Sequence, residues 1–83
     1  MHAISNHNKS ITDLKPGEWG IIDHFLKPND SFSISLQEIG LIPGTLFKVV
    51  RYACWGDPIE ISFNGYHITL RKSQTQFVKI RLV

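Results

Sequence analysis

The sequence contains very little cysteine and no long hydrophobic segment. Cys54 is the only cysteine among the 83 residues, so no disulfide can form within the chain, and this usage is typical of a reducing compartment. No uninterrupted apolar run approaches the roughly 20 residues that a membrane-spanning helix needs. The amino terminus, MHAISNHNKS, lacks the charged start and the apolar centre of a signal peptide. These absences predict a cytoplasmic protein.

Catalytic signatures are equally scarce. The chain has no glycine-rich loop of the kind that cradles phosphates, so we expect no nucleotide hydrolysis from it. Cys54 and a distant histidine are a conceivable nucleophile and base, but nothing in the sequence orients such a pair. Asp57 and Glu60 are close together, yet Asp57 belongs to a Gly-Asp-Pro turn, where we expect its carboxylate to accept hydrogen bonds from turn amides. We therefore predict a protein that is not an enzyme and that needs no cofactor.

Metal-ligand spacing is absent as well. The candidate ligands are one cysteine and four histidines, and no two of them form a Cys-x-x-Cys or His-x-x-x-His pair. A thiolate is also a poor ligand for selecting ferrous iron over zinc or copper. We expect no dedicated metal site among His2, His7, His24, His67 and Cys54.

The charge that is present is modest in total and uneven along the chain. Residues 1–44 carry three lysines against five acids, a net −2, and residues 45–83 carry six basic residues against two acids, a net +4. The second half would therefore prefer an acidic partner surface. Its cations form either an ordinary solvated strand face or a face for nucleic acid, and they are Lys48, Arg51, Arg71, Lys72, Lys79 and Arg81.

The hydrophobic fraction of 42% is sufficient for one compact core. We expect a flexible polar tail over residues 1–11 and a single domain over residues 12–83. Apolar residues at i, i+4 and i+7 predict a short helix over residues 31–39, capped by Asp30 or Ser31 and ended by Gly40. Leu41 and Ile42 are then expected to return the chain to the core.

Alternation of apolar and polar residues predicts strands in the rest of the chain. The first strand is expected at residues 19–25, a second follows residue 45, and the Asn64-Gly65 pair indicates a tight hairpin between two more. The segment RKSQTQ predicts a single tight turn, and the last strand is expected at residues 77–83 with Val78, Ile80 and Leu82 inward. Five short strands and one small helix predict a mainly β fold, a small five-stranded barrel whose closure would remove exposed sheet edges.

Three segments, LQEIGLIPGT, GDPIEI and ITLRK, follow one another in an order and at separations that resemble the FeoA family, the small cytosolic partner proteins of the ferrous iron transporter FeoB. The resemblance covers residues 11–83. It implies an SH3-like barrel with a helical insertion, no catalytic activity, and docking on the cytoplasmic domain of a FeoB-type transporter, so that the protein would meet the membrane only through that transporter. Cys54-Trp55 stands where the family commonly has Pro-Leu.

Two regions are candidate partner-binding surfaces. Trp55 lies in a loop, where it either folds back to cap the barrel or stands out as a contact anchor. The helix and the residues that follow it must mostly cover the barrel. If one of these residues is partly exposed, a groove that a partner can enter would lie between the helix and the barrel wall. We predict that the partner contacts Leu36, Ile39, Tyr52 and Trp55. The alternatives are nucleic-acid binding on the basic strand face, and metal sensing of the kind found in metal-dependent repressors that share this fold.

Overall fold

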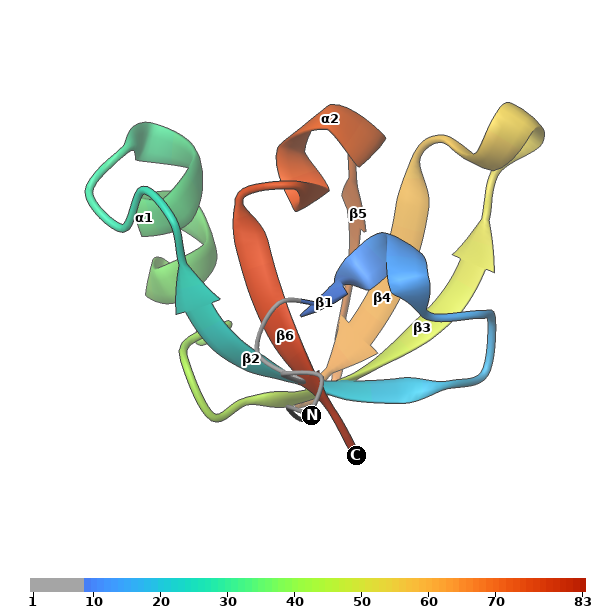
Figure 1. Cartoon of the computed structure of the whole chain (residues 1–83), viewed down its shortest axis with the longest axis horizontal. Helices are drawn as coiled ribbons and strands as arrows, with labels where there is room; N and C mark the ends of the chain where they lie inside the picture. Colours follow the sequence, from blue (N-terminus) through green and yellow to red (C-terminus); the bar gives the residue numbers. More distant parts are fainter. Residues whose placement is uncertain (1–8) are drawn as a thin grey trace, which may run out of the picture.

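The computed structural model describes residues 9–83 as one curled antiparallel sheet (Figure 1). The strand order is β1-β6-β2-β3-β4-β5, so β2 lies between the last strand, β6, and the strand that follows it in sequence, β3. Neither helix has the length and hydropathy to span a membrane within these residues. The elements in chain order are β1 (Lys9–Ser10), the 3₁₀ turn η2 (Ile11–Asp13), β2 (Trp19–Phe25), α1 (Ser31–Glu38), β3 (Leu46–Tyr52), the 3₁₀ turn η3 (Cys54–Gly56), β4 (Ile59–Phe63), β5 (Tyr66–Leu70), α2 (Lys72–Thr75) and β6 (Val78–Leu82).

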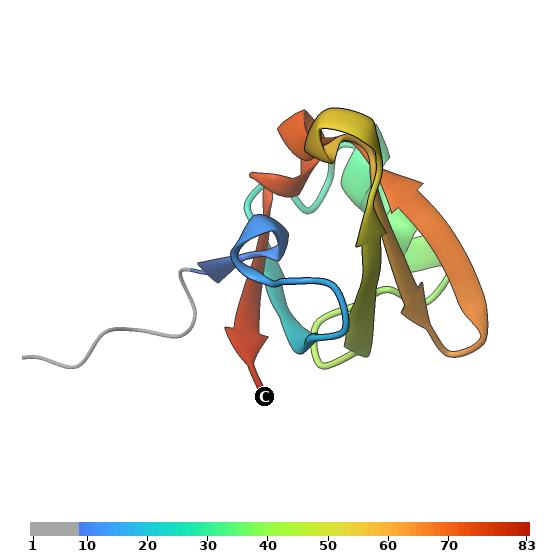
Figure 2. The same ribbon diagram turned by 90° about the vertical axis from the view of Figure 1, so that its right-hand side faces the viewer.

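The sheet curls around a single hydrophobic core. Alternate residues of each strand point inward, and Phe47 and Val49 on β3 are fully buried, as are Ile59 and Ile61 on β4. Each such side chain stabilises the fold by about 1.5–3 kcal/mol through the apolar area it removes from water. Figure 2 shows that the helices and η3 lie at one end of the curled sheet and the C-terminus at the other. The predicted mainly β fold is confirmed, with six strands in place of five. The expected closure into a barrel without exposed edges is not seen within residues 9–83, because β1 and β5 are the two edges of the sheet and do not pair with each other.

The helix α1 begins at the predicted residue and ends one residue before the predicted end, at Glu38. The side chain of Asp30 accepts a hydrogen bond from the amide of Ser33 over 2.9 Å, which satisfies one of the unpaired donors of the first turn. Gly40 has φ of +98° just past the end of the helix. Leu36 faces the core and is 5% exposed, because a helix this short gains its stability from packing.

The hairpin between β4 and β5 also follows the prediction. Asn64 and Gly65 have φ of 48° and 84°, the left-handed pair that a two-residue primed turn requires. Beyond β5, the tight turn predicted for residues 71–76 takes the form of one helical turn, α2. The amide of Leu26 donates to the carbonyl of Phe77 over 2.9 Å, which links the ends of β2 and β6.

Three expectations about the ends of elements are wrong. Lys9 and Ser10 pair with β6 and Ile11 is fully buried, so these residues belong to the fold, while the rest of the expected tail lies outside the described residues. Leu82 was expected inward but is 41% exposed, because the sheet ends beside it. Ile42 is 46% exposed, and only Leu41 returns to the core.

Replacement of Gly20 by Ala should destabilise the fold by about 1–3 kcal/mol, because overpacking forces neighbouring side chains from their positions. The added methyl carbon would lie 2.8 Å from Phe47 Cζ and 2.9 Å from Leu14 Cδ1. Urea denaturation measures this change, with Ser73→Ala on the exposed surface as a control that should stay within about 0.5 kcal/mol. An unchanged midpoint for Gly20→Ala would contradict the close packing of β2 on β3.

Candidate functional site

The connection between β3 and β4, residues 53–58, presents the most exposed large hydrophobic side chain among the described residues, and we call it the Trp55 loop. Trp55 is 94% exposed, so of the two orientations left open by the sequence the structure has the outward one. Its backbone has φ of 64° and ψ of 19°, a left-handed conformation that costs a bulky residue about 1–2 kcal/mol. Strain of this kind persists only where surrounding contacts hold it, and it is often found at functional positions.

Hydrogen bonds hold the Trp55 loop in shape. The amide of Ala53 donates to the carbonyl of Pro58 over 2.9 Å, and the amide of Gly56 donates to the carbonyl of Ala53 over 2.8 Å. These two bonds close the loop at its base and at its tip. The indole of Trp55 is therefore displayed on a defined backbone.

The Trp55 loop is also tied to α2. The carboxylate of Asp57 accepts a hydrogen bond from the amide of Lys72, 15 residues away, over 3.0 Å. This amide is one of the donors left unpaired at the start of a helix, so the carboxylate caps α2. Asp57 therefore bonds an amide as expected, but one of α2 and not one of its own turn. The contact also places Lys72 beside the loop, where a carbon added at Gly56 would lie 3.8 Å from Lys72 Nζ.

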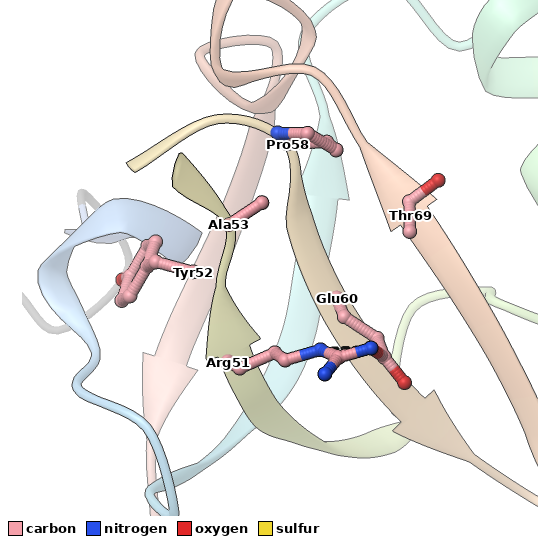
Figure 3. Close-up of a pocket in the computed structure, with 6 residues that line it drawn as sticks. All are labelled: Arg51, Tyr52, Ala53, Pro58, Glu60 and Thr69. Carbon is pink, nitrogen blue, oxygen red and sulfur yellow. Dashed lines mark hydrogen bonds and ion pairs between the residues drawn. The ribbon is translucent and has the colours of Figure 1, made fainter. Parts of the chain in front are cut away.

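A hollow of about 430 Å³ lies beside the Trp55 loop (Figure 3). A β-bulge between Val49 and Arg51 shifts the alternation of β3, so that Arg51 pairs with Glu60 on the outer face. Arg51 Nε lies 2.7 Å from Glu60 Oε1, and His67 Nδ1, which does not line the hollow, lies 3.1 Å from Glu60 Oε2. Glu60 thus joins β3, β4 and β5. The residues that line it are Arg51, Tyr52, Ala53, Pro58, Glu60 and Thr69.

The four residues predicted to bind a partner do not form one surface. Leu36 is buried in the core, and Ile39 is partly buried against it. The hydroxyl of Tyr52 donates a hydrogen bond to the carbonyl of Leu14, and burial, followed by the charges of Asp13 and Glu18, raises the pKa of Tyr52. Figures 1 and 2 show α1 and the Trp55 loop on opposite sides of the molecule. Partner binding by these residues stays a prediction, and Trp55 is the one of the four that is largely exposed.

A second apolar surface, which was not predicted from the sequence, lies around Trp19. Hollows of about 370 and 340 Å³ are both lined by Trp19, which is 46% exposed, and Lys48 Nζ lies 5.6 Å from the centre of its ring. The alternation of inward and outward residues along β2 could have indicated this surface, because Gly20 and Ile22 face the core and Trp19 therefore faces outward. The other exposed apolar residues that line these hollows are Leu46, Leu82 and Val83.

Neither described histidine is joined to more than one acidic residue in the ion pairs of the structure. Within residues 9–83 no group of three or more histidine, cysteine or acidic side chains is placed to hold a metal ion. His24 Nδ1 lies 2.6 Å from the carboxylate of Asp23, Arg81 Nε lies 3.4 Å from the same carboxylate, and Cys54 is exposed as a free thiol. His2 and His7 lie outside the described residues.

The carboxyl group of Glu60 should titrate below the usual range of glutamate. Hydrogen bonds from His67 and then Arg51 lower the pKa of Glu60, so its charged form persists to lower pH in the folded protein than in the unfolded one. The stability that this contributes is present above the unfolded pKa and is lost as the pH falls through the folded pKa. A ¹³C NMR titration of the carboxyl carbon tests this, and His67→Ala should raise the midpoint. A midpoint in His67→Ala equal to that of the wild type would contradict the contact.

Replacement of Asp57 by Ala should free the Trp55 loop and lower the stability by about 1 kcal/mol, as the loss of a helix cap does. Asp57→Asn is the matched control, because it keeps an acceptor oxygen for the amide of Lys72. ¹⁵N relaxation of residues 53–56 measures the mobility, and denaturation measures the stability. Equal relaxation in the Ala and Asn variants would show that the bond does not order the loop.

Comparison with known proteins supports the resemblance seen in the sequence. A family model described as the FeoA domain matches residues 9–82. The solution structure of the FeoA protein of Chlorobium tepidum has a TM-score of 0.83 at 27% identity, over 90% of this chain and 70% of that one. The iron(II) transport protein A of Clostridium thermocellum has a TM-score of 0.81 at 27% identity, over 90% of this chain but only 46% of that one.

The FeoA of Stenotrophomonas maltophilia, solved in complex with zinc and described as a prokaryotic SH3 domain protein, has a TM-score of 0.75 at 20% identity. It is covered over 88% of its length, and 87% of this chain is matched. This likeness shows the fold and confirms the SH3-like architecture. Because the family model spans nearly the whole chain, this protein belongs to the FeoA family, whose members are non-enzymatic accessory domains of ferrous iron transport.

Proposed function

We propose that this protein is a cytoplasmic accessory protein of ferrous iron uptake that docks on the cytoplasmic part of a FeoB-type transporter through the Trp55 loop and modulates transport. The observation that carries the proposal is the displayed indole of Trp55, which is 94% exposed. Tryptophan is enriched among the residues that dominate binding energy at protein interfaces. One solved relative of this protein is named iron(II) transport protein A, and another is described as a candidate ferrous iron transport activating factor.

The rigidity of the Trp55 loop supports an anchor role. Binding costs free energy when a contacting loop must be ordered, and a loop already held in its bound shape avoids most of that cost. Here the backbone bonds at Ala53 and Gly56 and the bond from Lys72 to Asp57 hold the loop before any partner arrives. Binding of the indole in a partner pocket would therefore lose little free energy to the ordering of the loop.

The charge beside the anchor indicates the character of the partner surface. Arg71 and Lys72 are exposed at the start of α2, and Lys72 Nζ lies close to Gly56. Cations at the rim of an interface accelerate association with an acidic surface and add specificity more than affinity. We therefore expect the transporter pocket to be apolar at its centre and acidic at its rim.

Docking can change transport only if it favours one state of the transporter. A bound protein shifts a conformational equilibrium by the difference between its affinities for the two states, and by nothing else. The protein itself supplies no reaction, so modulation must arise from this difference. We expect the affinity of the transporter's cytoplasmic domain for the Trp55 loop to differ between the states with and without guanine nucleotide.

Nucleic-acid binding is less well supported by the basic strand face. Arg51 pairs with Glu60, Arg81 with Asp23, and Lys48 lies over the ring of Trp19. Cations already engaged by carboxylates neutralise fewer phosphates and release fewer counterions. Binding to an acidic protein surface remains open to Arg71 and Lys72.

Titration of the labelled protein with the cytoplasmic domain of its FeoB partner, with and without guanine nucleotide, tests the proposal. Trp55→Ala should weaken binding by about 30-fold or more, which corresponds to the 2 kcal/mol that defines a dominant interface residue. Shifts of amide signals should concentrate in residues 52–58 and at the start of α2.

Ile34→Ala is the control for this titration. Ile34 is 42% exposed on α1, on the side of the molecule away from the Trp55 loop, so its loss should leave the affinity within about twofold. Loss of binding by Ile34→Ala together with unchanged binding by Trp55→Ala would move the docking surface to the helix. No binding in either nucleotide state would overturn the proposal.

A further inference from the structure

Within residues 9–83, the strand β5 has one long side with no neighbouring strand. It is the last strand of the sheet, and among the described residues it pairs only with β4. The primed turn at Asn64 and Gly65 makes Phe63 and Tyr66 a hydrogen-bonded pair. Because bonded and non-bonded pairs alternate along an antiparallel ladder, the N–H and C=O groups of His67 and Thr69 point away from β4. No backbone bond joins either residue to a segment outside the sheet within residues 9–83.

This edge carries none of the usual protection within the strand. Natural edge strands are blunted by proline, by lysine, by bulges or by very short length. The sequence of β5, YHITL, contains no proline and no charged lysine or arginine, and its pairing with β4 runs without a register shift, whereas shifts occur in the pairings of β2 with β6 and of β3 with β4. The opposite edge, β1, is only two residues long. An open edge of this kind is a template for an added strand.

The surroundings of the edge indicate what kind of strand would fit. Tyr66 is half exposed and stacks on Phe63 with ring centres 5.5 Å apart, and Ile68 is partly buried on the same inner side. His67 and Thr69 occupy the outer side. An added strand would therefore place apolar residues at every second position beside Tyr66 and Ile68.

Cations stand at the end of the edge strand, while the one acidic neighbour of β5, Glu60 opposite Thr69, is paired with Arg51 and His67. Residues 61–83 contain no aspartate and no glutamate, and Arg71 and Lys72 directly follow the strand. An acidic residue near the end of an added strand would meet these two cations. A second copy of this chain is disfavoured as the occupant, because a five-residue edge buries far less than the roughly 1,200 Å² of a stable interface and the second copy would bring no acidic residue of its own β5 to these cations.

We propose that β5 binds an extended acidic segment of the partner protein as an additional antiparallel strand, bonded through His67 and Thr69. The inference rests on the proposed function and specifies how the transporter's cytoplasmic part is held. The Trp55 loop supplies a side-chain anchor, and the β5 edge supplies main-chain hydrogen bonds. The hollow beside the loop lies between the two, because Thr69 of β5 and Pro58 of the loop both line it (Figure 3).

Amide hydrogen exchange in the wild-type protein tests this arrangement without any substitution. In the free protein the amides of His67 and Thr69 should exchange quickly, while that of Ile68, bonded to β4, should be protected. Addition of the transporter's cytoplasmic domain should slow exchange at His67 and Thr69 at least tenfold, with little change at Ile68. Docking without slower exchange at these two amides would overturn the inference and leave the proposed function intact.

A proline substitution supplies the second test. Thr69→Pro removes an N–H that does not bond β4 and should lower the affinity for the domain about tenfold relative to Thr69→Val, which keeps the N–H. Equal affinities in the two variants would overturn the inference. Wild-type protein that fails to bind the domain would overturn the proposed function and the inference together. Slower exchange at His67 and Thr69 on raising the concentration of the protein alone would identify a second copy as the occupant and overturn the assignment to a partner segment.

Discussion

The contact between Phe47 and Gly20 is the constraint on which the curled sheet depends. These residues face each other across β2 and β3, and a carbon added at Gly20 would lie 2.8 Å from the ring of Phe47. The missing side chain lets the ring lie over the central strand, and Leu14 closes the same space from the segment after η2. Because β2 also pairs with β6, the packing of Phe47 on Gly20 joins β3 and the C-terminal strand to one core. Glycine in a strand weakens the strand itself, and here close packing offsets that loss.

The proposed docking contact of Trp55 lies in a connection between strands and not in the hydrophobic core. The Trp55 loop joins β3 to β4, and α2 joins β5 to β6, so a bond between them links the two halves of the sheet at one end. The carboxylate of Asp57 makes that bond to the amide of Lys72. Since none of these atoms belongs to the hydrophobic core, the display of Trp55 depends on hydrogen bonds at the surface. A substitution in the loop would therefore change the proposed docking contact without changing the fold.

Alternation and turn chemistry predict most of the fold, and they fail where one residue changes the register. The helix, the primed turn and the buried faces of β3 and β4 follow directly from local patterns. The bulge at Val50 does not, because the run Val49-Val50-Arg51-Tyr52 reads equally well with either alternation, and the bulge decides that Arg51 faces outward. The burial of Ile11 depends on a two-residue strand that is too short for any periodic signal. The exposure of Trp55 depends on a left-handed backbone, which sequence gives no reason to expect of tryptophan.

The two contact surfaces differ in what they demand of a partner. An indole on a rigid loop requires a pocket of matching shape, so in the proposed function Trp55 would provide affinity and select among partners. An open strand edge accepts the main chain of almost any extended segment and selects only through alternate side chains and charge. Either surface alone is small, but both adjoin one hollow lined by Thr69, Glu60 and Pro58. A partner whose pocket and extended segment are joined by a short linker would bind both, and the second contact would then form at the high effective concentration of an intramolecular step.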